Sequence, residues 1–136
     1  MNKTYVLDAS AVLNLLTGEP GAGRVAQLVR EADRLRTPLL ASVANWGEVF
    51  YLSWQRHGEQ AAREALGDLS RLPIRVLPVD LAQATKAGEL KAIHKIPYVD
   101  CLAAALAVLQ QATLVTSDHD FDKLGRHFPI LWIGRG

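Results

Sequence analysis

Short apolar runs alternate with stretches of helical periodicity along the chain. Tyr5 to Leu7 is an unbroken apolar run, and Leu39 to Ala41 is a second one. Runs of this kind are typical of strands that are buried on both faces of a parallel sheet. Between them, apolar residues recur at helical spacing from Arg24 to Leu35, which predicts a helix with one buried face. Strand and helix therefore alternate from the start of the chain.

The same pattern assigns most of the remaining residues. It predicts helices at residues 9–16, 43–57, 59–72, 81–94 and 99–110, strands at 73–79, 112–116 and 130–133, a short helix from Asp118 and a loop at 18–23. Pro78 fits only the end of its strand or a strand at the edge of the sheet. No repeat or linker interrupts the series, so residues 1–136 are expected to form a single domain. The predicted fold is a three-layer α/β/α arrangement around a mostly parallel sheet of about four to five strands.

The predicted helix at 43–57 carries most of the aromatic residues of the first half of the chain. One face presents the set Val43, Trp46, Gly47, Phe50, Tyr51 and Trp54. We expect this face to be buried, with Phe50, Trp54 and also Trp132 in core or dimer contacts rather than stacked on bases. Asn45 lies on the opposite side of the helix, and Glu48 lies on the margin of the aromatic face.

Composition narrows the class of protein. An apolar share of 49% fits an ordinary globular domain, and the single cysteine, Cys101, excludes an intramolecular disulfide and fits a reducing cytosol. The longest apolar run, Cys101 to Leu109, is much shorter than the roughly 20 residues that span a bilayer. The residues before Tyr5 lack the pattern of a signal peptide. We therefore expect a cytoplasmic protein that is not inserted in a membrane. The net charge of +1 does not indicate a strongly basic nucleic-acid-binding protein.

Four carboxylates stand where the predicted elements meet. Asp8 and Asp118 each follow a predicted strand, whereas Glu48 and Asp100 lie near the starts of predicted helices. In a parallel sheet these positions converge on the edge where open α/β folds bind their ligands. Each acid also has a simpler explanation. Asp8 and Asp118 can cap the helices that follow them, and Glu48 can be an ordinary solvated residue.

Asp100 is the most informative of the four, because its helix is otherwise apolar on every side. A buried carboxylate must be paired, hydrogen-bonded or bound to a metal, although a position in the first turn of the helix is also favourable for an acid. Nearby, Asp120 and Asp122 are expected to be solvated, with Asp120 as a candidate secondary ligand. Four acids at one site need cations, and oxygen ligands without Cys or His select Mg²⁺ or Mn²⁺. Such ions bind phosphate and promote its hydrolysis.

Four segments, taken in order, resemble the PIN domain, and among its members most closely the VapC toxins of toxin–antitoxin pairs. The segments are Asp8-Ala9-Ser10-Ala11 with Gly18-Glu19-Pro20-Gly21, then Ala44-Asn45-Trp46-Gly47-Glu48-Val49, then Asp100 in its Ala/Leu-rich helix, and Thr116-Ser117-Asp118-His119-Asp120-Phe121. The resemblance covers essentially the whole chain. It departs from the family before Asp100, where residues 96–99 lack a small hydroxyl residue that is often found there.

The resemblance implies a metal-dependent endoribonuclease that hydrolyses RNA phosphodiester bonds. Its Mg²⁺ or Mn²⁺ ligands and catalytic acids would be Asp8, Glu48, Asp100 and Asp118, with Asp120 as a less regular ligand. Ser10 and Thr116 match small polar positions at the mouth of the site and would position the substrate. The family also implies a VapB-type antitoxin as partner and a homodimer of the toxin.

Two other functions remain open at this stage. One is a catalytically weak PIN-like module that binds RNA or protein, although all four acids are present. The other is an α/β phosphatase or phosphoacceptor domain, in which an Asp also follows the first strand. Such a phosphatase needs a second acid two residues after the first, but that position is Ser10 here. A phosphoacceptor domain of the receiver type needs an acidic pair and a lysine after a late strand, and neither is evident.

Overall fold

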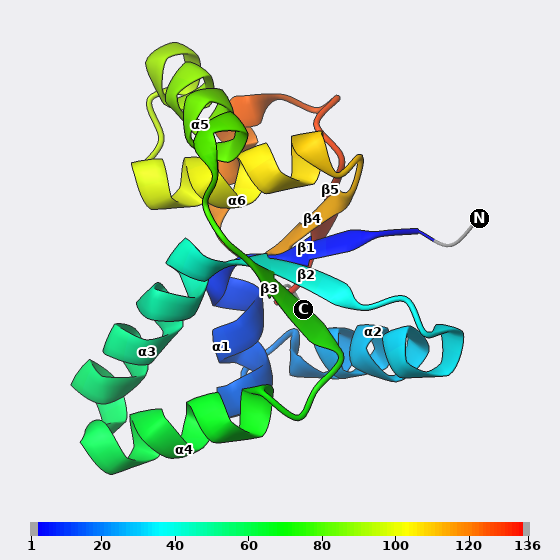
Figure 1. Ribbon diagram of the computed structural model, residues 1–136, viewed down its shortest axis with the longest axis vertical. Coiled ribbons are helices and arrows are strands. Elements are labelled where there is room, and N and C mark those ends of the chain that lie inside the picture. The colour runs from blue at the N-terminus through cyan, green and yellow to red at the C-terminus, as the bar shows by residue number, and fades with distance from the viewer. Residues whose placement is uncertain (1–2, 135–136) are drawn as a thin grey trace.

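The fold is built around a five-stranded parallel sheet with strand order β3-β2-β1-β4-β5 (Figure 1). The computed structural model describes residues 3–134. The strands are β1 (Tyr5–Leu7), β2 (Leu39–Ser42), β3 (Ile74–Leu77), β4 (Thr113–Thr116) and β5 (Ile130–Trp132). Residues 1–2 and 135–136, the ends of the predicted 1–136 domain, lie outside the described residues. The extent of that domain stays a prediction.

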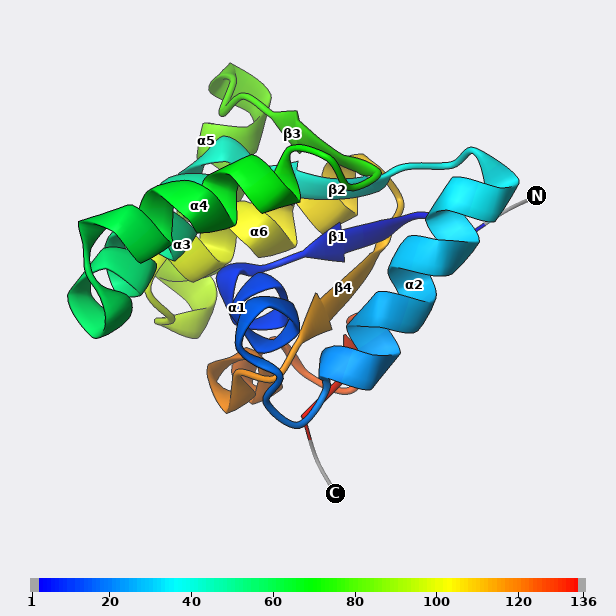
Figure 2. The same cartoon turned by 90° about the horizontal axis from the view of Figure 1, so that it is seen from below.

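Helices cover both faces of this sheet. They are α1 (Ala9–Thr17), α2 (Ala22–Leu35), α3 (Val43–His57), α4 (Glu59–Leu69), α5 (Leu81–His94), α6 (Tyr98–Leu109) and the short 3-10 helix η1 (His119–Leu124). Helices α5 and α6 lie on one face of the sheet and α1 to α4 on the other (Figure 1). Seen from below, α1, α2 and α4 stand in front of the strands (Figure 2). The predicted three-layer architecture with a parallel sheet is confirmed.

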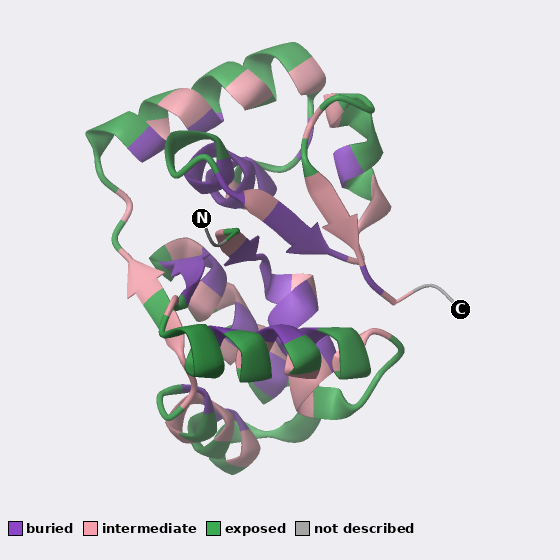
Figure 3. Ribbon diagram, turned by 90° about the vertical axis from the view of Figure 1, so that its right-hand side faces the viewer, coloured by how far each residue is buried: buried purple, intermediate pink, exposed green. Residues whose placement is uncertain are grey.

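Successive side chains along each central strand point to opposite faces of the sheet and pack into two separate hydrophobic cores. Val6 and Leu114 pack with the buried residues of α6, whereas Leu7 and Val115 pack with α1 and α2. Figure 3 shows the buried residues concentrated along the central strands, while the outer helices expose one side. Helix α6 is buried from Asp100 to Ala107, as its uninterrupted apolar sequence predicts.

Element boundaries differ from the sequence-based prediction at a few ends. Helix α2 begins at Ala22, within the segment expected to be a loop, because Gly21 with φ 104° takes the left-handed conformation that starts it. Helix α4 ends at Leu69 rather than at residue 72. β3 is an edge strand that stops before Pro78, as expected for a residue that cannot donate to the ladder.

The predicted burial of the aromatic face of α3 is confirmed only in part: Trp46 is half-buried and packs against the core, and Phe50 is half-buried. Val43, Tyr51 and Trp54 are exposed by 44%, 49% and 41%. The helix instead buries Asn45, Val49 and Ser53, which follow one another at intervals of four residues. The most deeply buried side of α3 is therefore the one that carries Asn45, Val49 and Ser53, two of which are polar.

Within residues 3–134, no single helix is long and apolar enough to cross a membrane. Helices α5 and α6 reach that length and composition only as a pair, and they are bent by 118° at the break between them.

Candidate active site

Asp8 is fixed at the carboxyl end of β1 by hydrogen bonds to both of its oxygens. Its Oδ1 accepts from the Ser10 hydroxyl at 2.7 Å and from the Ala11 amide at 2.9 Å, and its Oδ2 accepts from the Thr116 hydroxyl at 2.6 Å. The side chain is 3% exposed. Asp8 therefore caps α1, as one of its two sequence-based explanations expects, and it is buried. Its role as a metal ligand stays a prediction.

Ser10 and Thr116 join the ends of β1 and β4. Their hydroxyl oxygens lie 3.1 Å apart, the Ser117 amide donates to Ser10 Oγ, and the Asp118 amide donates to Thr116 Oγ1. Both hydroxyls thus orient Asp8 and the backbone that leads to Asp118. Their expected role in positioning substrate stays a prediction.

Three further carboxylates meet beside Asp8. One oxygen from each of Asp100, Asp118 and Asp120 lies within 4.8 Å of the others. Asp100 comes from the first turn of α6, whereas Asp118 follows β4 and caps η1 by accepting the Asp120 amide at 2.9 Å. Asp120, which the sequence indicated only as a secondary ligand, is therefore a full member of this group.

The electrostatics of the site are unfavourable for ionised acids. Burial, together with the negative charges of Asp118 and Glu48 and then those of Asp8 and Asp120, raises the pKa of Asp100 to about 7. Burial also raises the pKa of Asp8 to about 6, even though the hydrogen bonds that it accepts act in the opposite direction. The charges of four acids act on Asp100, and we call the five together the acidic cluster: Asp8, Glu48, Asp100, Asp118 and Asp120.

The donor atoms of the acidic cluster fit a hard divalent cation. All of them are carboxylate oxygens, which suit Mg²⁺ and Mn²⁺, and a cation would offset the burial and repulsion that raise the pKa values of Asp8, Glu48 and Asp100. Asp100, Asp118 and Asp120 lie close enough together to hold such an ion, with Asp8 and Glu48 adding negative charge.

Comparisons with known proteins identify the family to which this fold belongs. The family model of the PIN domain matches residues 5–127. The chain belongs to the PIN domain family. A search of curated proteins found no match.

Solved structures match over nearly the whole chain. VapBC2 from Rickettsia felis, bound to a DNA fragment from its promoter, has a TM-score of 0.78 at 16% identity over 96% of this chain and 98% of its own. VapC20 from Mycobacterium tuberculosis, a toxin that cleaves the sarcin-ricin loop, has a TM-score of 0.70 at 22% identity over 89% and 95%. A toxin–antitoxin complex from Klebsiella pneumoniae scores 0.67 at 20% identity over 93% and 95%. At these identities the likeness is one of fold.

In this PIN domain, Glu48 is held by a residue that the sequence did not single out. Asn45 Nδ2 lies 3.4 Å from Glu48 Oε1 and 3.5 Å from the carbonyl oxygen of Val99, next to Asp100. Asn45 is 1% exposed, and its Oδ1 is a buried polar atom without a hydrogen-bond partner among residues 3–134. The spacing of three residues from Glu48 on one helix was the available indication. Burial raises the pKa of Glu48, opposed by the bond from Asn45.

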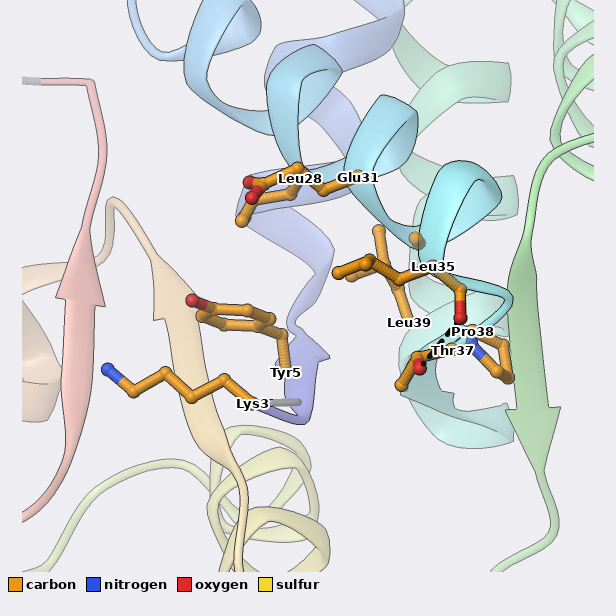
Figure 4. Close-up of a pocket in the computed structure, with 9 residues that line it drawn as sticks. Lys3, Tyr5, Leu28, Glu31, Leu35, Thr37, Pro38 and Leu39 are labelled. Atoms are coloured by element: carbon orange, nitrogen blue, oxygen red, sulfur yellow. Dashed lines mark hydrogen bonds between the residues drawn. The ribbon is translucent and has the colours of Figure 1, made fainter. Parts of the chain in front are cut away.

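A well-formed pocket of the PIN domain lies away from the acidic cluster. It measures about 320 Å³ and is lined by side chains from the amino-terminal ends of β1 and β2 and from α2 (Figure 4). Lys3, Tyr5 and Glu31 supply its polar groups. Because the acids lie at the carboxyl ends of the strands, this pocket is at the opposite edge of the sheet.

Proposed function

We propose that this PIN domain is a divalent-metal-dependent endoribonuclease and the toxin of a VapBC-type pair. The observation that supports this most strongly is the convergence of Asp8, Glu48, Asp100, Asp118 and Asp120 on one edge of the sheet. The similarity to structures from VapBC pairs, one of them a VapC toxin that cleaves the sarcin-ricin loop, supports the same function.

The residues of the acidic cluster would hold Mg²⁺ or Mn²⁺. When bound, such a cation lowers the pKa of a water and stabilises the charge that develops on a phosphodiester. Asp100 would release its proton as the cation binds, because its raised pKa of about 7 reflects burial and repulsion that the positive charge offsets. Asp8 would keep a fixed orientation through the hydrogen bonds from Ser10 and Thr116.

The proposal extends to partners and location. The similarity to VapBC complexes supports a VapB-type antitoxin as the partner. On α3 and on α5, which lie on opposite faces of the sheet (Figure 1), large exposed apolar side chains are available for contacts with it or with a second toxin subunit. These side chains are Val43, Tyr51, Trp54, Leu81 and Ile93. We place the protein in the cytoplasm, where its RNA substrates are. Sedimentation of the purified chain over a range of concentrations tests the homodimer.

The decisive experiment is cleavage of a structured RNA pool in Mg²⁺, in Mn²⁺ and in EDTA. Asp8→Asn and Asp100→Asn, verified as folded, are compared with Asp68→Asn, which changes an exposed acid paired with Arg71 on the surface. We expect metal-dependent cleavage in the wild type and in Asp68→Asn, and a loss of about 100-fold or more in the two cluster variants.

Cleavage that persists in EDTA or in both cluster variants would contradict the proposal. Metal binding without cleavage of any RNA would favour the binding module instead. Hydrolysis of a small phosphomonoester by the wild type, lost in Asp8→Asn, would favour the phosphatase.

A further inference from the structure

A second pocket lies against β5, the strand that pairs with β4 just before Asp118. It measures about 340 Å³ and is formed by η1, the loop that follows it and β5. Its walls include the aromatic rings of Phe128 and Trp132, the carboxylate of Asp122 and the guanidinium of Arg126. A pocket of this size lies at the small end of the range for ligand sites and suits one nucleotide unit.

Strand pairing and chain connectivity link residues of this pocket to the acids. Trp132 is paired with Thr116 across β4 and β5, and neighbouring strands are about 4.8 Å apart. The Thr116 hydroxyl in turn donates to Asp8. Asp122, on the pocket wall, is two residues from Asp120 in the acidic cluster. A chain of nucleotides with one phosphate at the acids would therefore pass this pocket with a neighbouring unit.

The indole ring of Trp132 is held in place before any ligand binds. The ring of His119 stacks on it with centroids 4.4 Å apart and planes at 4°, and His119 Nδ1 lies 3.1 Å from Asp122 Oδ2. His119 is not part of the pocket wall, whereas Trp132 is. An aromatic ring of fixed orientation can accept a base by stacking at little cost in conformational entropy.

The polar groups of the pocket complement a nucleotide. Arg126 is exposed and can donate to a phosphate oxygen, with both charge and directional hydrogen bonds. Asp122 can accept from an exocyclic amino group of a base. The pocket at the amino ends of the strands offers groups of the same kinds in Tyr5, Lys3 and Glu31, but it lies at the opposite edge of the sheet from the acidic cluster.

We infer that this pocket binds one nucleotide of the RNA next to the cleaved phosphodiester, with its base against Trp132 and its phosphate on Arg126. The inference rests on the proposed function and adds a base-binding subsite to it. Trp132 packs against the core, as the sequence leads us to expect, and would in addition contact the substrate.

Fluorescence of Trp132 tests the inference without cleavage. Substituting the other two tryptophans in Trp46→Phe/Trp54→Phe leaves Trp132 as the sole emitter. The four ribonucleoside 5′-monophosphates are titrated in EDTA, which removes any contribution of a bound metal. We expect saturable quenching by at least one of them. In the same background Arg126→Ala should weaken binding about tenfold, the scale of one charge-assisted hydrogen bond, and Arg34→Ala, on α2, should leave it unchanged.

The titration has clear negative outcomes. Absence of quenching by all four nucleotides, equal binding in Arg126→Ala, or equal quenching by inorganic phosphate alone would each overturn the inference. Cleavage assays then separate it from the proposed function. Arg126→Ala should raise KM for RNA with kcat nearly unchanged. If the wild type cleaves no RNA, the proposed function fails while the titration still decides the pocket.

Discussion

The two edges of the sheet differ in shape and in charge. At the amino ends of the strands, a pocket of about 320 Å³ is lined mainly by apolar side chains such as Leu28 and Leu39, with one lysine and one glutamate (Figure 4). At the carboxyl ends, five acids gather, and burial raises the pKa of two of them, Asp8 and Asp100, to about 6 and about 7.

The amino edge thus has a mainly apolar pocket, whereas the carboxyl edge has buried acids with raised pKa values. Every crossover in a parallel sheet delivers a strand's carboxyl end and the start of the next helix to the same edge, so polar residues from distant segments meet there. The opposite edge collects helix ends and strand starts. In this protein a well-shaped pocket forms there, yet the groups whose ionisation is perturbed are all at the carboxyl edge or in α6 beside it.

The largest expected effect on metal binding comes from removing an acid at the carboxyl edge, with an acid at the amino edge as the control. Asp118→Ala should weaken Mn²⁺ binding by about 100-fold, because it takes a carboxylate out of the group that lies within 4.8 Å. Glu31→Ala, at the amino edge, should leave Mn²⁺ affinity unchanged. Calorimetric titration of both proteins measures this. Equal affinities would show that the acidic cluster is not the metal site.

A smaller effect is expected from the residue that holds Glu48. Asn45→Ala should weaken Mn²⁺ binding and lower kcat by about tenfold, since partners of metal ligands orient them. The matched control is Gln60→Ala, which removes another amide-to-carboxylate hydrogen bond, from Gln60 to Glu64, on the exposed surface of α4. A loss of stability alone, with metal affinity and kcat unchanged once folding is verified, would limit Asn45 to a packing role.

The stability of the metal-free protein should depend on pH in an unusual direction. The folded-state pKa values of Asp8 and Asp100 lie above their ordinary value of 3.8, so the folded state binds more protons than the unfolded state between these limits. The contribution of these two acids to stability is then full below about pH 4 and is lost as pH rises through 6 and 7. We expect Tm without metal to be higher at pH 5 than at pH 8, by about 5 °C.

Two variations sharpen this measurement. Mg²⁺ or Mn²⁺ at pH 8 should restore part of the lost stability, because binding to the folded state alone raises Tm. Asp100→Asn should flatten the pH dependence and stabilise the metal-free protein at pH 8. A Tm that rises with pH and does not change when Mg²⁺ or Mn²⁺ is added would contradict the electrostatic description of the carboxyl edge.

The sequence determined the elements and most members of the acidic cluster. The apolar runs at β1 and β4, the all-apolar sequence of α6 and the acids that follow or interrupt them are contiguous patterns, and local structure follows contiguous patterns. Because the alternation of strand and helix dictates a parallel sheet, even the convergence of Asp8, Asp100 and Asp118 on one edge was predictable.

Tertiary structure decided which face of each helix is buried and which side chains touch. Helix α3 has an aromatic face and a polar face, and only packing shows that it buries Asn45 and exposes Trp54. The same holds for Asp120 within the acidic cluster and for His119 on Trp132. These contacts join segments that are brought together by strand order and crossing angles, and no pattern within a single segment encodes them. The sequence thus specifies where acids can meet, and three-dimensional packing specifies what surrounds them.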